Sequence, residues 1–332
     1  MIIHLNRSID QARAEELGRQ YEAICMHDGG RYVLITSSKL KEADATLKDA
    51  SEEIYVTDSD IQLAGKKYIS TTRTIDLGVA QIGGESHSTL VITGPCSVES
   101  EEQIEQAAKL CVELGVKVLR AGAYKPRTSP YTFQGLGLRG LELLDKMRSK
   151  YGLKIITEVR DSTHVDEVIE YADIIQVGAK AMYDQGILRK CGKSNKPVLI
   201  KRGFGSTLQE FVQSAEFVLS SGNPNVMLCE RGIRTFETKT RFTLDLCGVA
   251  WLKQYTNLPV ILDPSHAIGY AYGVADLSRA CVAMGVDGLL IETHPNPKVA
   301  KSDAEQQLDF DQFRALHHSL GAVASAVGKK II

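Results

Sequence analysis

In the stretch Leu90-Val-Ile-Thr-Gly-Pro-Cys-Ser97, a short apolar segment is followed by polar residues that could bind a ligand or a metal. This pattern recurs along the chain. Eight such apolar segments lie between residue 90 and residue 291, and each is followed by a stretch able to form an amphipathic helix. They span residues 90–93, 116–119, 155–157, 174–177, 198–200, 226–228, 260–262 and 288–291. The alternation indicates parallel strands joined by crossover helices. Eight repeats predict an α/β fold built as a closed (β/α)8 TIM barrel rather than an open, doubly wound sheet.

The residues before the barrel predict a separate small domain, residues 1–58. Ile2 to Leu5 and Ile54 to Val56 have the composition of strands, and a glycine turn at His27-Asp-Gly-Gly30 separates two further strand-like runs. Ser8 begins the capping pattern S-x-x-Q of a first helix, and a second helix is expected from about Lys39 to Ala50. The order β-α-β-β-α-β is that of a ferredoxin-like α+β domain. Residues 59–89 are expected to be a linker with a hairpin that caps the barrel, and residues 90–332 the barrel itself.

Composition places the chain among ordinary globular proteins. Its 39 Lys and Arg residues nearly balance 41 Asp and Glu residues, so bulk charge favours neither nucleic acid nor a membrane as a partner. The first residues lack the pattern of a signal peptide, and no apolar run is long enough to span a bilayer, so we expect a cytoplasmic protein. The seven cysteines are scattered without a C-x-x-C pair, which argues against disulfides and a zinc ribbon.

The residues at the ends of the predicted strands are the candidates for function, because active sites of this fold lie at the C-terminal ends of the strands. Nearly every strand end carries a charged or metal-competent side chain. In chain order these are Cys96, Arg120, Glu158, Lys180, Lys201, Cys229 to Arg231, Asp263 to His266, and Glu292 to His294.

Four residues with side chains that can bind metals predict a divalent metal site. Cys96, His266 and Glu292 follow the first, seventh and eighth strands, which are neighbours in a closed barrel. Asp303 is the fourth candidate, although spacing alone does not separate it from Asp309 and Asp311. Mixed sulfur, nitrogen and oxygen ligands suit Mn, Fe, Co or Zn without selecting among them. A lone cysteine or histidine is more often structural, so the prediction depends on the four acting together.

Six cations are expected at the same barrel mouth, and three of them lie in the stiff basic loop Arg120-Ala-Gly-Ala-Tyr-Lys-Pro-Arg-Thr-Ser-Pro-Tyr131. So many cations predict one ligand with several negative charges, or two ligands with phosphate and carboxylate groups. The alternative is that one or two of them form structural ion pairs with Glu158, Glu230 or Asp263. The six are Arg120, Lys125, Arg127, Lys180, Lys201 and Arg231.

Two further sequence patterns are interpreted as structural and not as functional sites. Gly135 to Gly140 has the spelling G-x-G-x-x-G, but the dinucleotide fingerprint requires a strand immediately before its first glycine, and none is predicted there. Glu237 to Arg241 is interpreted as the solvated start of a helix.

Seven motifs together resemble the type I beta class of 3-deoxy-D-arabino-heptulosonate 7-phosphate (DAHP) synthases, over about residues 60–330. The small N-terminal unit is similar to the ferredoxin-like regulatory domain of some members. The motifs are G-P-C-S at 94–97, R-A-G-A-Y-K-P-R-T-S-P at 120–130, K-R-G at 201–203, C-E-R-G-I-R at 229–234, D-P-S-H at 263–266, Glu292, and S-D at 302–303.

The resemblance implies an aldol-like condensation of phosphoenolpyruvate (PEP) with erythrose 4-phosphate, the first step of the shikimate pathway to the aromatic amino acids. It implies that Cys96, His266, Glu292 and Asp303 hold the divalent metal. It also implies a homotetramer. Because a detached small domain on a first-step enzyme is suited to gating by a bound ligand, we expect feedback by tyrosine or phenylalanine at the N-terminal domain. For PEP, the implied ligands are Arg120, Lys125 and Lys201 on the carboxylate, and Lys180 and Arg231 on the phosphate. Lys125 is also the implied proton donor, Arg127 and Thr128 would hold the sugar phosphate, and Pro126 and Asp263 complete the substrate-binding set.

Three departures from the family pattern leave the second substrate open. Relatives often have Arg where this chain has Lys180, and a basic residue soon after D-P-S-H, where this chain has Ala267-Ile-Gly-Tyr-Ala-Tyr272. Ala304 stands where a glycine is usual. The alternatives are therefore a PEP-dependent synthase for another aldose phosphate, such as arabinose 5-phosphate, and a catalytically weak barrel that serves as a regulatory or partner-binding protein.

Overall fold

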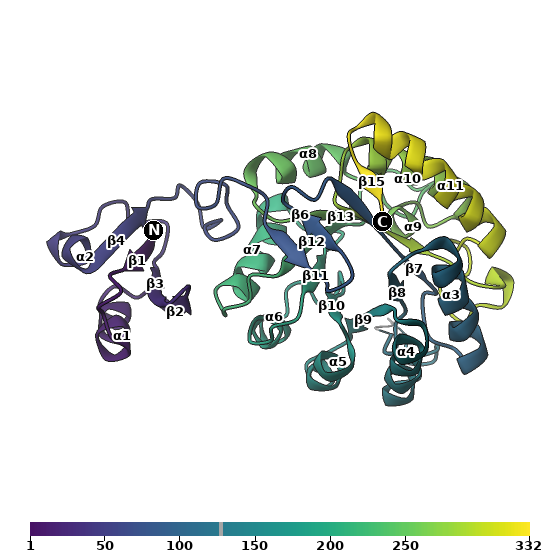
Figure 1. Ribbon diagram of the computed structural model, residues 1–332, viewed down its shortest axis with the longest axis horizontal. Helices are drawn as coiled ribbons and strands as arrows, with labels where there is room; N and C mark the ends of the chain where they lie inside the picture. Colours follow the sequence, from purple (N-terminus) through teal and green to yellow (C-terminus); the bar gives the residue numbers. More distant parts are fainter. Residues whose placement is uncertain (126–128) are drawn as a thin grey trace.

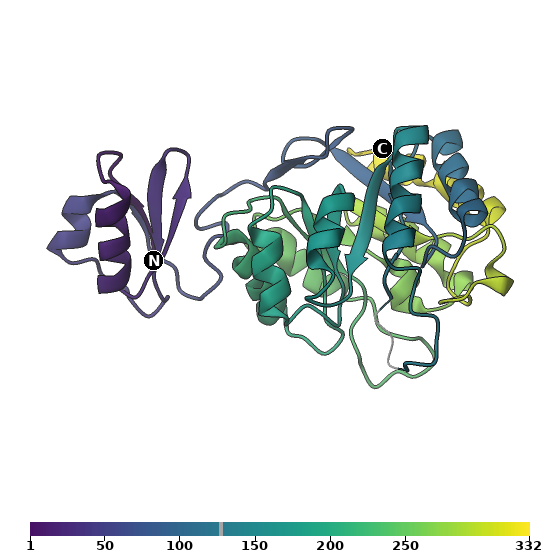
Figure 2. The same ribbon diagram turned by 90° about the horizontal axis from the view of Figure 1, so that it is seen from below.

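The computed structural model describes residues 1–125 and 129–332, in a small N-terminal unit beside a large barrel (Figure 1; Figure 2). Within these residues, eight parallel strands form the barrel. β14 pairs with β7 from Gly288 opposite Leu90 to Glu292 opposite Gly94, and this pairing closes the sheet. The predicted closed barrel is therefore confirmed. Its strands are β7 Ser88–Gly94, β8 Val118–Arg120, β9 Lys154–Val159, β10 Ile174–Val177, β11 Val198–Lys201, β12 Val226–Glu230, β13 Val260–Leu262 and β14 Gly288–Glu292.

Helices surround the barrel and cover its outer face (Figure 1). The first of them, α3, shows how the sequence sets its ends: Ser100 caps the first turn by accepting from the Gln103 backbone N–H, and Gly115 ends the helix with a left-handed φ of 71°. The helices are α3 Glu101–Leu114, α4 Leu138–Tyr151, α5 Val165–Tyr171, α6 Gln185–Gly192, α7 Leu208–Leu219, α8 Leu246–Tyr255, α9 Pro264–Ile268, α10 Ala271–Ala283, η1 Pro297–Val299 and α11 Phe310–Ala326. None of the helices in the described part of the chain is long and apolar enough to cross a membrane.

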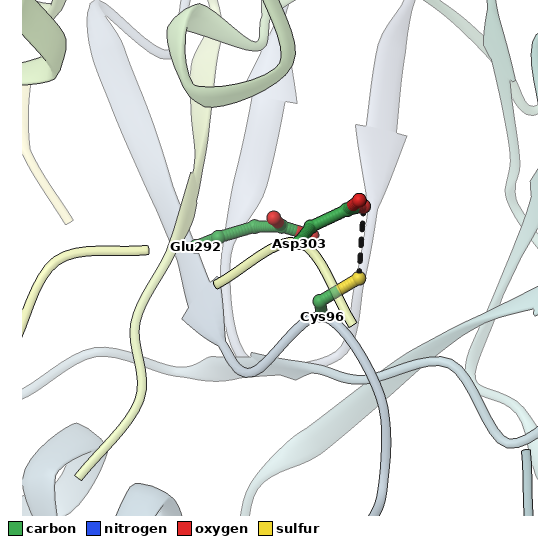
Figure 3. A group of neighbouring side chains, drawn as sticks. All are labelled: Cys96, Glu292 and Asp303. Atoms are coloured by element: carbon green, nitrogen blue, oxygen red, sulfur yellow. Dashed lines mark hydrogen bonds between the residues drawn. The ribbon is translucent and has the colours of Figure 1, made fainter. Parts of the chain in front are cut away.

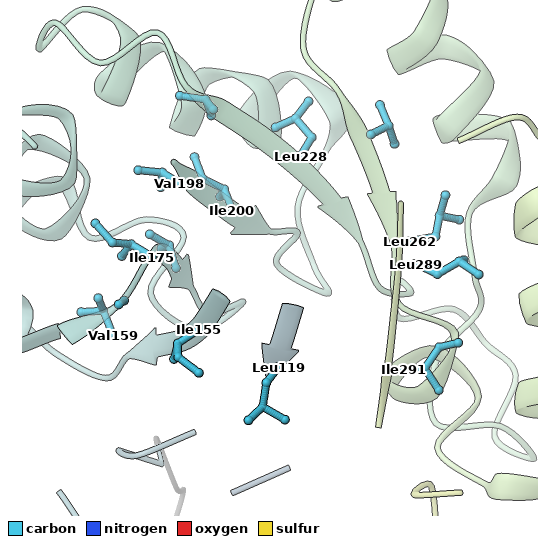
Figure 4. Packing of buried hydrophobic residues seen from close by; sticks show 14 of the residues in the cluster. Leu119, Ile155, Val159, Ile175, Val198, Ile200, Leu228, Leu262, Leu289 and Ile291 are labelled. Carbon is cyan, nitrogen blue, oxygen red and sulfur yellow. The ribbon is translucent and has the colours of Figure 1, made fainter. Parts of the chain in front are cut away.

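Side chains alternate between the two faces of the barrel wall, as the strand period of two requires. In β12, Leu228 belongs to the outer cluster that packs against the helices, whereas Met227 and Cys229 belong to the cluster inside the barrel. The outer cluster takes Leu289 and Ile291 from β14 in the same way (Figure 4). This alternation decides which strand-end residues reach the centre of the mouth.

A two-stranded hairpin closes the end of the barrel opposite the mouth. β5 (Thr74–Asp76) and β6 (Gln81–Gly83) pair antiparallel, and Ile75, Leu77 and Ile82 join the apolar cluster inside the barrel. Gly83 packs so closely against Pro259, just before β13, that a Cβ at residue 83 would lie 2.7 Å from the proline ring. The short strand β15 (Lys330–Ile331) pairs with the first residues of β7 at this same end.

The N-terminal unit is a four-stranded antiparallel sheet in the order β2-β3-β1-β4, with two helices in the chain order β-α-β-β-α-β. A core of its own includes Met1, Ile3, Leu17, Leu34 and Leu47. The elements are β1 Ile2–Leu5, α1 Gln11–Gln20, β2 Ile24–Asp28, β3 Arg31–Ile35, α2 Ala45–Ala50 and β4 Ser51–Tyr55.

Both helix starts in this unit differ from the prediction. The N-cap of α1 is Asp10 and not Ser8, because the Asp10 carboxylate accepts from the backbone N–H of Arg13. α2 begins after Asp44, which accepts from the Leu47 backbone N–H, and so starts later than the predicted Lys39. In both cases a carboxylate at the right spacing takes the capping position.

The linker joins the two units through one carboxylate of the barrel. Glu216 on α7 accepts backbone N–H bonds from Gln62 (2.6 Å), Leu63 (3.1 Å) and Ala64 (2.9 Å). Leu63 and Ala64 belong to the same apolar cluster as Val33 of the N-terminal sheet. The linker is therefore attached to the barrel by polar and apolar contacts together.

Candidate active site at the barrel mouth

Several of the predicted site residues are the last residues of the strands, not the residues after them. Arg120, Lys201 and Glu292 end β8, β11 and β14. Each stands two residues beyond a side chain of the inner apolar cluster, namely Val118, Leu199 and Leu290. The period of two therefore directs these three charged groups into the barrel, where apolar side chains stop and polar ones begin.

A cavity of ≈ 230 Å³ opens at this end of the barrel. Five Lys and Arg side chains dominate its wall, which also includes two phenylalanines, two carboxylates, one histidine and two small residues. The lining residues are Lys125, Glu158, Gly178, Ala179, Lys180, Lys201, Phe204, Arg231, Arg241, Phe242, His266 and Asp303.

Three of the four predicted metal ligands converge beside this cavity. Cys96, Glu292 and Asp303 each offer one atom, and these atoms all lie within 4.8 Å of one another (Figure 3). The Cys96 thiol donates to Asp303 Oδ2 at 3.2 Å. Sulfur and carboxylate oxygen in one buried group fit a borderline divalent ion. These residues can therefore hold a metal.

His266 faces the same group and brings a nitrogen ligand. Its Nε2 lies 3.5 Å from Glu292 Oε1 and 3.9 Å from Asp303 Oδ2. Its Nδ1 lies 2.7 Å from Asp263 Oδ2, and Asp263 Oδ1 also accepts from the His266 backbone N–H. A carboxylate on the far nitrogen is the usual way in which proteins orient a metal-binding imidazole.

The position of Asp303 separates it from the two other aspartates that the sequence left as candidates. Asp309 caps α11 by accepting from the Gln312 backbone N–H, and Asp311 pairs with Arg314 at 2.8 Å on the surface. Asp303 has a left-handed φ of 47°, which is uncommon for a residue other than glycine.

Burial and neighbouring charges shift the pKa values of all four residues of this group. Burial raises the pKa of the Cys96 thiol to about 12, so a metal would have to displace its proton. Burial also opposes ionisation of Glu292 and Asp303, but the positive charge that His266 carries at acid pH, followed by those of nearby Lys and Arg residues, outweighs it and holds both pKa values below their ordinary range. Burial lowers the pKa of His266 despite the nearby Asp263, which favours the neutral imidazole that binds metals.

Two of the predicted cations are ion-paired: the structural alternative named the partner of Lys201, which is Asp263, but not the partner of Arg120, which is Glu292. Arg120 contacts Glu292, and Lys201 Nζ lies 2.5 Å from Asp263 Oδ2. Asp263, predicted to bind substrate, is fully buried and contacts Lys201 and His266 rather than lining the cavity.

The other described cations border the cavity directly. Lys125 Nζ donates to the Cys96 carbonyl at 3.2 Å, next to the metal-ligand group, and Lys180 lines the wall. Arg231 is only 5% exposed, and neither its Nε nor its Nη1 has a hydrogen-bond partner among residues 1–125 and 129–332. Pro126, Arg127 and Thr128, predicted to contact substrates, lie outside the described residues.

Arg241 was missed by the sequence interpretation. No helix begins at Glu237: residues 237–241 lie in the loop between β12 and α8, and Arg241 lines the cavity. Arg241 Nη1 donates to Gln306 Oε1 at 2.7 Å, and Gln306 Nε2 donates to Glu292 Oε2 at 2.6 Å. The prediction failed because a mixture of Lys, Thr and Arg residues has no period that reveals the path of a loop.

The G-x-G-x-x-G spelling does not belong to a dinucleotide site. Gly137 is the N-cap of α4, and the described residues between Arg120 and Gly135 include no strand. Gly135 allows close backbone packing, since a Cβ there would lie 2.1 Å from the carbonyl oxygen of Ala123.

Comparison with known proteins agrees with this geometry. A profile of the DAHP synthetase I family matches residues 66–328. A phospho-2-dehydro-3-deoxyheptonate aldolase of Thermotoga maritima is 46% identical over 283 residues, which are 85% of this chain and 83% of that protein. A crystal structure of the DAHP synthase from the same organism matches with a TM-score of 0.81 and 40% identity, over 100% of this chain and 99% of that one. A 2-dehydro-3-deoxyphosphooctonate aldolase of Syntrophotalea carbinolica is 32% identical over 74% of this chain and 94% of its own. The chain belongs to the DAHP synthetase I family.

Proposed function

We propose that this protein is a DAHP synthase, which condenses PEP with erythrose 4-phosphate to give DAHP and inorganic phosphate in the first step of the shikimate pathway. The observation that carries the proposal is the cation-lined cavity directly beside a Cys/His/Glu/Asp group. Membership of the family and 46% identity to a phospho-2-dehydro-3-deoxyheptonate aldolase support the choice of reaction.

The cations of the cavity suit a substrate with a carboxylate and a phosphate. Arg120, Lys125 and Lys201 would hold the PEP carboxylate, and Lys180 and Arg231 its phosphate. Arg127 and Thr128, with Pro126 beside them, would hold the phosphate of the sugar. Fixing both substrates in one orientation and neutralising their charge would provide much of the rate enhancement.

Cys96, His266, Glu292 and Asp303 would hold a divalent ion of the Mn, Fe, Co or Zn class. When bound, such an ion supplies Lewis-acid polarisation of the aldehyde oxygen. Bond formation joins C3 of PEP to the aldehyde carbon, and Lys125 would give a proton to the oxygen that becomes an alkoxide. Water then adds at C2 of the former PEP, and cleavage of the C–O bond at C2 releases phosphate.

The N-terminal unit is proposed to be a ferredoxin-like regulatory domain, because its β-α-β-β-α-β order and its sheet order β2-β3-β1-β4 are those of that fold. Tyrosine or phenylalanine is the proposed effector, and the proposed assembly is a cytoplasmic homotetramer. Feedback by an end product suits an enzyme that catalyses the first step of a pathway.

A second candidate is supported by the relative named 2-dehydro-3-deoxyphosphooctonate aldolase, at 32% identity. This is a synthase with another aldose phosphate as its second substrate, for example arabinose 5-phosphate. Lys180 lines the cavity. A lysine there keeps the charge of the arginine usual in relatives but loses its bidentate fork.

The test is phosphate release from PEP with a panel of aldose phosphates, after chelation and after adding back single divalent metals. We expect turnover with PEP and erythrose 4-phosphate together, loss of turnover on chelation, and recovery with metal. A clear preference for arabinose 5-phosphate would favour the second candidate. Full activity of the metal-stripped protein would refute the metal assignment.

A further inference from the structure

We propose that Phe242 is a positioning residue for Arg231, and that its ring keeps this guanidinium ready to bind an oxyanion. The inference rests on the proposed function insofar as the oxyanion is the phosphate of PEP. The guanidinium carbon of Arg231 lies 4.3 Å from the centroid of the Phe242 ring. Both residues line the cavity.

Arg231 differs from three other buried cations of the barrel, Arg120, Lys201 and Arg202, which are ion-paired. Arg120 and Lys201 contact Glu292 and Asp263, and Arg202 contacts Glu230 at 2.9 Å. Arg231 forms no ion pair within 4.0 Å in the described part of the chain, and two of its nitrogens lack hydrogen-bond partners there. Burial lowers the pKa of Arg231, in the direction expected for a charge removed from water.

An aromatic ring can stabilise such a cation without occupying its donors. The face of the ring attracts the guanidinium through its quadrupole, and this attraction is strongest where water is excluded. A carboxylate would provide more attraction, but it would accept the hydrogen bonds that an oxyanion needs. Phe242 therefore offsets part of the cost of burying Arg231 and leaves Nε and Nη1 available to a ligand.

The surroundings of Phe242 fix its ring in place. Its ring stacks on Phe204, with centroids 5.4 Å apart and planes at 23°. The Phe242 backbone N–H donates to the carbonyl of Ala267 at 2.8 Å. At Gly232, where φ is 97°, a Cβ would lie 2.7 Å from Phe242 Cβ, so glycine is needed for the two parts of the loop to approach.

The stack continues on its other ring. The guanidinium carbon of Arg234 lies 4.8 Å from the centroid of Phe204, and the Arg234 backbone N–H donates to the Phe204 carbonyl at 2.7 Å. The Phe204 ring thus carries the guanidinium of Arg234, and the Phe242 ring carries that of Arg231 at 4.3 Å and, farther away, that of Arg241 at 5.8 Å. This arrangement links β11, which precedes Phe204, to the loop after β12, which carries Arg231 and Phe242.

The test compares Phe242→Leu, which keeps an apolar side chain without a ring face, with Phe242→Tyr, which keeps the ring. Calorimetric titration with PEP alone and with inorganic phosphate measures binding, and steady-state kinetics measure KM for PEP, KM for erythrose 4-phosphate and kcat. Phe236→Leu is the matched control, because Phe236 lies in the same loop and is 98% exposed.

We expect Phe242→Leu to weaken binding of PEP and of phosphate by roughly 5- to 30-fold, which spans cation–π contacts from exposed to desolvated sites. KM for PEP should rise in parallel, with little change in kcat or in KM for erythrose 4-phosphate. Phe242→Tyr and Phe236→Leu should behave like wild type. In an Arg231→Lys background, Phe242→Leu should have a smaller effect, because the planar cation is gone.

Different results separate the inference from the proposed function. If PEP and phosphate bind but no aldose phosphate supports turnover, the proposed function fails, and the binding series still tests Phe242. The inference is overturned if Phe242→Leu binds both anions as wild type does, if Phe242→Tyr loses as much as Phe242→Leu, or if wild type binds neither anion.

Discussion

At the scale of single residues, the candidate metal ligands were predictable and their supporting residues were not. Cys96, His266 and Glu292 follow from the strand order, because the first, seventh and eighth strands must be neighbours in a closed barrel. Gln306 and Phe242 gave no such signal. They lie in loops, where side-chain direction has no period, and an amide or a phenyl ring has no chemistry that identifies it in a sequence.

The contact of Gln306 with Glu292 predicts a change in metal affinity. Gln306 is buried between Arg241 and Glu292, and its amide fixes the direction of the Glu292 carboxylate. Gln306→Leu should weaken binding of Mn or Zn by roughly 10- to 100-fold, the usual cost of losing an outer partner of a metal ligand. Isothermal titration calorimetry of the metal-stripped protein with each ion measures these affinities.

The control for this prediction is Gln185→Leu, the same change at an exposed position at the start of α6. Its metal affinity should match that of wild type. Unchanged affinity in Gln306→Leu would mean that the remaining contacts of Glu292, with Arg120 and His266, are enough to orient it.

At the scale of elements, the sequence identified every barrel strand but misplaced several ends. The predicted run 116–119 is β8 at Val118–Arg120, and Glu158 lies within β9 rather than after it. Hydrophobicity marks where the apolar part of a strand stops, whereas backbone pairing continues into the charged residues of the mouth. Lys201 pairs with Cys229 in this way, as part of the parallel ladder between β11 and β12.

The contact between helix α7 and the linker predicts a pH dependence of stability. Burial raises the pKa of Glu216 from 4.5 to about 7, although three backbone N–H donors and Arg73 oppose the shift. The folded protein therefore holds a proton there that the unfolded chain releases above about pH 4.5. This contribution to stability is complete below that pH and is lost as the pH rises through about 7.

Denaturant unfolding of wild type and Glu216→Gln between pH 4.5 and 8 tests this sign. The free energy of unfolding of wild type, relative to that of the variant, should fall as the pH rises, by at most roughly 3 kcal/mol. The variant removes the ionisable group and keeps one oxygen acceptor. Taking the difference between the two proteins therefore cancels the pH dependence that comes from all other groups. A difference that stays constant with pH would contradict the shift.

At the scale of the whole molecule, the sequence predicted two units, and the structure adds how the linker is attached. The family profile begins at residue 66, so the barrel is matched without the N-terminal unit. The N-terminal sheet has its own core of Ile3, Leu34 and others. Val33 of this sheet and Leu63 of the linker belong to the same apolar cluster as the outer core of the barrel, and no local pattern could identify their partners.

Removal of residues 1–58 tests the proposed regulation. Phosphate release should continue in the shortened chain, whereas inhibition by tyrosine or phenylalanine should be lost, because the effector site would be gone. Dose–response curves for both amino acids, on the full and shortened chains, measure it. Equal inhibition of the two chains would rule out the N-terminal unit as the site of feedback.

The hairpin at the base of the barrel determines by which end substrates enter and products leave. Ile75, Leu77 and Ile82 pack inside the barrel at the end opposite the mouth, so apolar side chains block that end. Everything that enters must leave by the same route. Phosphate formed in the cavity has to leave before the next anion can bind among the cations. Any segment lying over the mouth would therefore slow both substrate entry and phosphate release.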